Sequence, residues 1–89
     1  MIQTFADKDL EAVYRGKRVK RFAQVGAALE RKLRSLDEAE TLRELQAVPG
    51  NQLERLYTGE FSIRLNIQWR LVFRWTDSGP QDVRLEDYH

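Results

Sequence analysis

Cysteine is absent from the 89 residues, and histidine occurs once, at His89. The chain therefore has no disulfide and no thiol chemistry. A zinc site takes about four nitrogen or sulfur ligands, so no metal and no cofactor is expected. The apolar runs are only a few residues long, far short of a membrane span. With neither disulfides nor a recognisable signal peptide, the sequence fits a cytoplasmic protein without a membrane partner.

Charge of one sign is nearly balanced by the other, and the net charge is +1. The length predicts a single domain over residues 1–89 with a modest core, burying roughly 60 to 65% of the unfolded surface. The charges are nevertheless segregated, because the stretch YRGKRVKR contains Arg15, Lys17, Arg18, Lys20 and Arg21. A basic patch on a neutral protein indicates a polyanionic partner. The alternative is a solvated helix face that keeps the protein soluble.

The first half of the chain has the pattern of a short strand followed by helices. In MIQTFA, Ile2 and Thr4 alternate with Gln3 and Phe5, and the segment predicts a short opening strand. Asp7 can cap a helix over KDLEAVYR, and Gly16 can end it. The TLRE sequence at 41–44 is a capping box that predicts a third helix, ended by the Pro-Gly-Asn at 49–51. Between them, apolar residues at helical spacing predict a second helix: Phe22, Val25, Leu29, Leu33 and Leu36.

The second half has the pattern of strands. FSIRLNI at 61–67 and WRLVFRWT at 69–76 alternate with period two, and their short connection predicts an antiparallel hairpin. NQLERLY at 51–57 predicts a strand before the hairpin. DSGP at 77–80 predicts a turn, and QDVRLEDY at 81–88 a last strand with Val83 and Leu85 inward. The fold class is therefore α+β, with two to three helices on one face of a mainly antiparallel sheet.

Parity along the strands divides the sheet into an apolar and a cationic face. We expect the helices to cover the apolar face, which carries Phe61, Ile63, Leu71, Phe73 and Trp75. The opposite face, or part of it, then carries Ser62, Arg64, Asn66, Arg70, Arg74 and Arg84, and by parity Tyr88.

A cationic face with a histidine could bind and cleave RNA. RNA carries its own nucleophile, the 2′-hydroxyl, so a ribonuclease needs a base, cations for the charged transition state and an acid, without a metal. His89 titrates near neutral pH, arginine suits phosphate oxygens, and Tyr88 can stack on an unpaired base. Other interpretations stay open, since a terminal histidine is often inert and Tyr88 can be a packing residue. Arg70 and Arg74 could simply pair with acids across the sheet, namely Glu54, Glu60, Glu86 or Asp87.

Several segments resemble a known family. GNQLERL, FSIRLNIQWRLVFRW and DVRLEDYH, together with the opening MIQTFADKDLEAVYRG and VKRF, resemble the HigB-type (plasmid-maintenance killer) toxins of the RelE superfamily. The resemblance covers essentially the whole chain. It implies a compact RelE-like α+β domain and a toxin of a type II toxin–antitoxin pair, which enters the ribosomal A site and cleaves messenger RNA there.

The resemblance also implies partners and site residues. The partners are a HigA-type helix-turn-helix antitoxin, the 30S A site with its message, and operator DNA bound by the toxin–antitoxin complex. Carried over by position, the catalytic candidates are Arg70, Asp87, Tyr88 and His89. The candidates for RNA or ribosome binding are Arg64, Arg74 and the basic run of Arg15, Lys17, Arg18, Lys20 and Arg21.

Two departures from the family pattern concern the proposed base. Glu54 stands where some HigB toxins have a catalytic histidine, and a carboxylate can accept a proton but repels phosphate. The following LYTGEFS loop is shorter than the family's usual form, with Tyr57 near the position of a family lysine. The leading hypothesis is a ribosome-dependent messenger-RNA endoribonuclease that includes Glu54 in its site. The alternative is a non-catalytic or weakly catalytic RelE-fold protein that binds RNA or its antitoxin.

Overall fold

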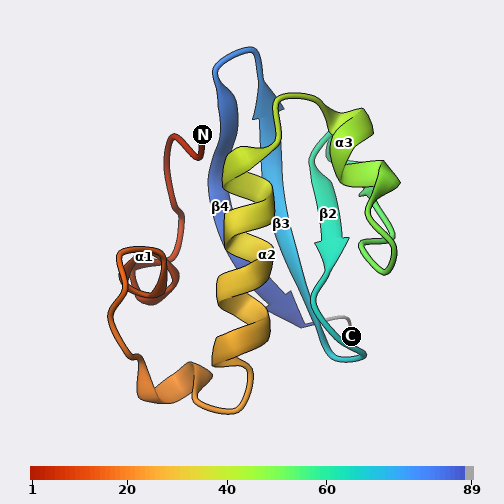
Figure 1. Ribbon diagram of the computed structural model, residues 1–89. Helices are drawn as coiled ribbons and strands as arrows, with labels where there is room; N and C mark the ends of the chain where they lie inside the picture. Colours follow the sequence, from red (N-terminus) through yellow and green to blue (C-terminus); the bar gives the residue numbers. More distant parts are fainter. Residues whose placement is uncertain (88–89) are drawn as a thin grey trace.

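The computed structural model describes residues 1–87 and shows helices on one face of an antiparallel sheet (Figure 1). The helical elements are α1 (Lys8–Tyr14), the 3-10 turn η1 (Lys20–Phe22), α2 (Gly26–Glu38) and α3 (Leu42–Ala47). The four strands β1 (Glu54–Arg55), β2 (Phe61–Arg64), β3 (Trp69–Thr76) and β4 (Gly79–Asp87) lie side by side in chain order. The predicted α+β class is confirmed. Among residues 1–87, no helix is long and apolar enough to cross a bilayer.

The predicted helix caps are present. The Asp7 carboxylate accepts hydrogen bonds from the backbone N–H groups of Asp9 and Leu10 and so caps α1. Thr41 and Glu44 form the reciprocal capping box at the start of α3. The second helix begins later than predicted, because the chain turns through η1 and enters α2 only at Gly26. Phe22 is still buried, but it packs from the 3-10 turn and not from α2.

The apolar face of the sheet packs against α2, as predicted. Ile63, Leu71 and Phe73 are fully buried, and they belong to one core cluster with the apolar stripe of α2, Leu29, Leu33 and Leu36. Phe61 and Trp75 are partly buried against the same cluster. Burial of this kind is the main source of stability in a domain of this size. It also leaves the opposite face of the sheet, here called the outer face, uncovered by helices (Figure 1).

The opening segment lies along β4 but is not the predicted strand. Its backbone pairs with β4 through Gln3 N to Pro80 O, at 2.8 Å, and Ala6 N to Val83 O, at 3.0 Å. Only one β-bridge forms, the parallel bridge between Phe5 and Val83. The segment is interrupted at both ends, since the N–H of Ile2 donates to the Asp37 carboxylate of α2 and α1 begins at residue 8.

The first two strands, β1 and β2, are shorter than the alternation predicts. The strand predicted at 51–57 is reduced to the two residues of β1, because Gln52 has a positive φ of 47° that ends the extended backbone. The strand predicted at 61–67 ends at Arg64. There the Asn66 side chain accepts hydrogen bonds from the N–H groups of Gln68 and Trp69, both at 2.8 Å, and bends the chain into the hairpin turn.

A β-bulge in β4 decides which residues reach the outer face. The predicted last strand begins two residues earlier than expected, at Gly79, and its register against β3 shifts between Val72 and Arg74. Asp82 takes a positive φ of 54° at this point. Gln81 therefore lies opposite Arg74, whereas Val83 is buried in the core. Beyond the bulge Arg84 lies opposite Val72, which returns Arg84 to the outer face.

Candidate functional site

Two rows of side chains cross the outer face. Strand register joins Glu54, Ser62, Val72 and Arg84 in one row, and Arg64, Arg70 and Glu86 in the next. Ser62 and Val72 are almost completely buried, although no helix within residues 1–87 covers this face and Val72 is outside the core cluster. We infer that the long charged side chains around them exclude water from these two small residues.

A cavity of about 500 Å³ lies between these rows and the loop after β1. It is lined by Glu54, Arg55, Leu56, Tyr57, Thr58, Glu60, Arg70, Arg84 and Glu86. The cavity therefore brings together two of the predicted catalytic residues, Glu54 and Arg70, which are 16 positions apart in the printed sequence. It also contains Arg84, which the sequence placed on the cationic face, and Glu60 and Glu86, which the sequence named only as acids that could pair with arginines.

Arg84 is held by two carboxylates. Its Nη1 and Nη2 donate to Glu60 Oε2 and Oε1, at 2.6 and 3.0 Å, and its Nε donates to Glu86 Oε2 at 2.5 Å. The Arg84 hydrogen bonds hold the pKa of Glu60 below its ordinary value, against the opposing effect of burial. The same bonds, that to Glu60 first, raise the pKa of Arg84. Glu60 and Arg84 are therefore both charged at neutral pH.

Arg70 shares Glu86 with Arg84. The Nη2 of Arg70 lies 4.0 Å from Glu86 Oε1, and the Arg70 side chain is 22% exposed. Glu86 thus links the two guanidinium groups through its two oxygens. Arg64 is directly opposite Arg70 across the hairpin, and its Nε donates to the backbone oxygen of Asn66 at 3.1 Å. Three arginines from three strands therefore lie in adjoining rows of the outer face.

Other predicted residues lie outside this cavity. Arg74 is on the outer face, where its guanidinium donates to Asp82 and Gln81, each at 2.8 Å. Asp87 is opposite Trp69 in the register, so it belongs to the other face of its strand from Glu86. The Gln68 side chain donates to the Asp87 carboxylate at 3.3 Å. Tyr88 and His89, the remaining catalytic candidates, lie outside the described residues.

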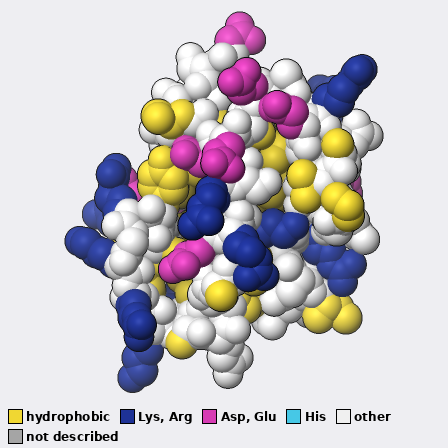
Figure 2. All heavy atoms as spheres, in the orientation of Figure 1, with side chains coloured by type: hydrophobic (Ala, Val, Ile, Leu, Met, Phe, Trp, Pro, Cys, Tyr) yellow, Lys and Arg dark blue, Asp and Glu magenta, His cyan; other side chains and the backbone are white. Residues whose placement is uncertain are grey.

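The basic run joins α1 to α2, on the helix side of the molecule. Arg15 pairs with Glu11, and Arg21 pairs with Asp7 and Asp9. Lys17, Arg18 and Lys20 line a separate cavity at the start of α2. Lys and Arg side chains follow the left edge of the helix face in Figure 2, beside α1 and this connection. The run therefore forms a surface distinct from the cavity on the outer face.

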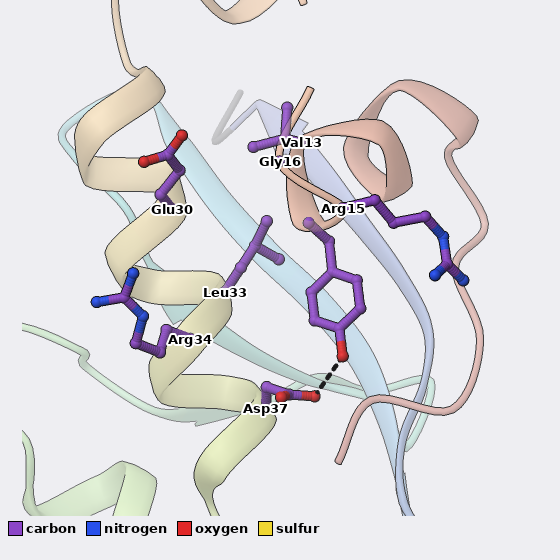
Figure 3. Close-up of a pocket in the computed structure, with 8 residues that line it drawn as sticks. Val13, Arg15, Gly16, Glu30, Leu33, Arg34 and Asp37 are labelled. Carbon is purple, nitrogen blue, oxygen red and sulfur yellow. Dashed lines mark hydrogen bonds between the residues drawn. The ribbon is translucent and has the colours of Figure 1, made fainter. Parts of the chain in front are cut away.

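Another cavity, of about 590 Å³, lies between α1 and α2, and a hydrogen bond joins two of the residues that line it (Figure 3). The Tyr14 hydroxyl donates to Asp37 Oδ1 at 2.9 Å, and the same oxygen accepts the Ile2 N–H at 2.8 Å. Burial, together with the bond to Asp37, raises the pKa of Tyr14. Asp37 therefore holds α1 and the opening segment against α2. These hydrogen bonds give Tyr14 and Asp37 a structural role.

The outer-face cavity has the chemistry of a phosphate site with an adjacent base. A guanidinium fork binds non-bridging phosphate oxygens through paired N–H groups, and Arg70 and Arg84 provide two such forks within it. Glu54 is an exposed carboxylate that can accept a proton. Three carboxylates and three arginines line the cavity, so its formal charge is balanced before a ligand enters.

Comparison with known proteins decides the family. The sequence profile described as the RelE-like toxin of the type II toxin–antitoxin system HigB matches residues 3–89. This chain belongs to that family. It is 40% identical to toxin HigB-1 of Vibrio cholerae serotype O1 over 93 aligned positions, which cover 99% of this chain and 98% of the relative. The resemblance seen in the sequence is thus confirmed, and a toxin of a type II system implies an antitoxin as its partner.

The sequence missed Glu60 and Arg84 as a pair within this toxin. A signal existed for Arg84 and Glu86, because residues two apart on a strand share a face. Glu60 gives no such signal. It lies in the loop between β1 and β2, and its approach to Arg84 depends on the β4 bulge and the three-dimensional path of that loop.

Proposed function

We propose that this toxin is a ribosome-dependent endoribonuclease, which cleaves messenger RNA in the A site and thereby inhibits translation. We also propose that the outer-face cavity is where the message binds. The observation that carries the proposal is the presence of Glu54 and Arg70 in one cavity, beside the second guanidinium of Arg84. One site then contains a candidate base and two guanidinium groups that can bind phosphate. Family membership supports the activity itself.

The proposed reaction uses the 2′-hydroxyl of the message. This oxygen loses its proton to a base and bonds to the adjacent phosphorus. The bond from phosphorus to the 5′-oxygen of the next nucleotide then breaks, and an acid protonates that oxygen. We assign to Arg70 the stabilisation of the negative charge that develops on the phosphate in the transition state. We assign proton transfer to His89, with Glu54 and Asp87 as further candidates for that role. Tyr88 would stack on an unpaired base. The residues suffice without a metal.

We also propose a location and partners for the toxin. We place it in the cytoplasm, where it would meet the 30S A site, and we assign it a helix-turn-helix antitoxin of the HigA type. The complex of the two would bind operator DNA. Arg64, Arg74 and the basic run would contribute affinity for RNA or the ribosome and take no part in chemistry.

A second function has its own supporting observation. The cavity has as many carboxylates as arginines, and one carboxylate, Glu54, stands at the position where some HigB toxins have a catalytic histidine. Such a site holds phosphate less strongly than a cationic one. The alternative is therefore a weakly catalytic or non-catalytic toxin that binds the ribosome or only its antitoxin.

Induced expression separates these functions. Wild-type toxin, Arg70→Ala and His89→Gln would be expressed without antitoxin while growth is followed and cleavage sites in cellular messages are mapped. The endoribonuclease predicts arrest with new message ends for wild type alone, since both variants lose a group needed for chemistry. Arrest by all three proteins without new ends would favour the non-catalytic function. Circular dichroism of the purified variants controls for folding.

A further inference from the structure

Resting on the proposed function, we propose that Arg84 is a further phosphate-binding residue of the message site and that Glu60 occupies its fork in the RNA-free toxin. Message binding then requires an exchange, in which the Glu60 carboxylate leaves Arg84 and a phosphate of the message takes its place. Glu60 is thus a residue that attenuates affinity.

The geometry of the guanidinium carries this inference. An arginine has five N–H donors in a planar fork. In Arg84 the edge formed by Nη1 and Nη2 is taken by both oxygens of Glu60, at 2.6 and 3.0 Å, and Nε is taken by Glu86 at 2.5 Å. A phosphate that binds through two parallel N–H groups would need an edge of the Arg84 guanidinium on which Glu60 or Glu86 already accepts a hydrogen bond. Bidentate contact with Arg84 therefore requires displacement of a carboxylate.

Glu60 is the carboxylate better placed to leave. Glu86 lies on β4 within a long paired ladder and also approaches Arg70. Glu60 ends a tight loop from Leu56, beside the two-residue strand β1. The Thr58 hydroxyl already lies 3.1 Å from Glu60 Oε1, so the carboxylate has a polar contact on the loop side when it leaves Arg84. We therefore assign the movement in the proposed exchange to Glu60, the carboxylate from the loop.

The charges that line the cavity explain why the exchange would favour message binding. Arg55, Arg70 and Arg84 are balanced by Glu54, Glu60 and Glu86 around the lining. While Glu60 is bound to Arg84, a message phosphate that enters the cavity meets no net positive charge, and a carboxylate occupies the guanidinium to which the phosphate would bind. When Glu60 turns away, the phosphate is paired with Arg84 and the repulsion between the two anions falls with distance. Removal of the Glu60 charge should therefore strengthen binding, although it breaks an ion pair.

A double-mutant cycle tests the exchange. Affinity is measured for ribosomes programmed with a message that carries 2′-deoxyribose at the A-site codon, which cannot be cleaved through a 2′-hydroxyl. Glu60→Gln should bind at least fivefold more tightly than wild type, and Arg84→Gln at least fivefold more weakly. Glu60→Gln added to Arg84→Gln should strengthen binding much less than it does in the wild-type background, because no fork remains to be released. Glu38→Gln, an exposed acid on α2, controls for the change in net charge.

Other outcomes overturn the proposal. If Glu60→Gln weakens binding as much as Arg84→Gln does, Glu60 orients Arg84 and does not compete for it. If Glu60→Gln has no effect, the pair lies outside the message site. Urea unfolding checks each variant, and Glu60→Met, of similar length, replaces a glutamine variant that fails to fold. Absence of wild-type binding would contradict the proposed function itself, whereas measurable binding that ignores Glu60 contradicts only the exchange.

Discussion

The guanidinium of Arg84 faces the carboxylate of Glu60 end-on, with both nitrogens of the fork engaged, at 2.6 and 3.0 Å. The pair joins β4 to the loop between β1 and β2, and the two residues are 24 positions apart. Arg84 belongs to the row of the outer face that also contains Glu54, Ser62 and Val72. The same contact thus bears on the stability of the sheet and on the charge of the proposed site.

The stability of the pair should depend on pH. Glu60 has a pKa below its ordinary value of 4.5 in the folded protein. Its stabilisation is therefore fully present above that ordinary value and is lost as pH falls through the depressed folded pKa. Glu60→Gln should cost about 2 kcal/mol in the free energy of unfolding at pH 7, and much less at pH 3. Urea denaturation at the two pH values measures this.

Glu11→Gln provides the comparison for that experiment. Its partner Arg15 is 63% exposed and Glu11 40% exposed, so loss of this surface pair should cost less than about 0.5 kcal/mol at pH 7. Equal losses for Glu11→Gln and Glu60→Gln would contradict the account of the outer-face pair.

Gly79→Ala should be strongly destabilising. Gly79 has φ of +126°, and an added Cβ would lie 2.2 Å from the backbone oxygen of Met1. Backbone strain and the displaced opening segment should together cost about 3 kcal/mol. Gly59→Ala has a similar positive φ of +91° with nothing near the new atom, so it should cost only about 1 kcal/mol. Thermal unfolding of the two variants isolates the contact with Met1, and equal losses would show that this contact is unimportant.

Asp37→Ala should loosen α1 from α2. It removes the acceptor shared by the Tyr14 hydroxyl and the Ile2 N–H and should cost about 2 to 3 kcal/mol. Tyr14→Phe removes one donor and should cost about 1 kcal/mol. The pKa of Tyr14 is raised above 10.0 in the fold, so its stabilisation is present below that pH and lost as pH rises through the folded pKa. Above that point Tyr14→Phe should approach wild type in urea unfolding; a constant gap would exclude this linkage.

The basic run should bind ribosomal RNA without affecting chemistry. Lys17 and Lys20 are exposed and lie apart from the outer-face cavity, so Lys17→Glu with Lys20→Glu should leave folding unchanged. Binding to ribosomes should weaken, and the dependence of affinity on salt should become less steep, because fewer counterions are released. The positions of the cleavage sites should stay the same. Filter binding over a salt series measures the effect, and unaltered affinity would show that the run is a solvated face.

Local pattern was sufficient to predict the layers of this fold. Period-two alternation in β2 and β3 places Ile63, Leu71 and Phe73 on the buried face, because strand parity needs no tertiary information. The caps at Asp7 and Thr41 are likewise local. Arg70 was placed on the outer face for the same reason, and Glu54 came from the family resemblance alone.

Features that depend on tertiary contact could not be predicted in this way. The β4 bulge at Asp82 turns Gln81 outward, against simple parity. The sequence predicts a strand for the opening segment, yet the N–H of Ile2 donates to the Asp37 carboxylate of α2. The approach of Glu60 to Arg84 combines this bulge with the loop path. The periodicity of the sequence predicts none of these contacts.

The most direct test of the account measures cleavage by purified toxin on the ribosome. One defined message is presented as naked RNA and in programmed ribosomes, and the new ends are mapped for wild type, Arg70→Ala and His89→Gln. The account predicts cleavage at the A-site codon on ribosomes, little on naked RNA because positioning is missing, and losses of about 10² to 10⁴ in rate for His89→Gln. Efficient cleavage of naked RNA, or full activity of either variant, would contradict it.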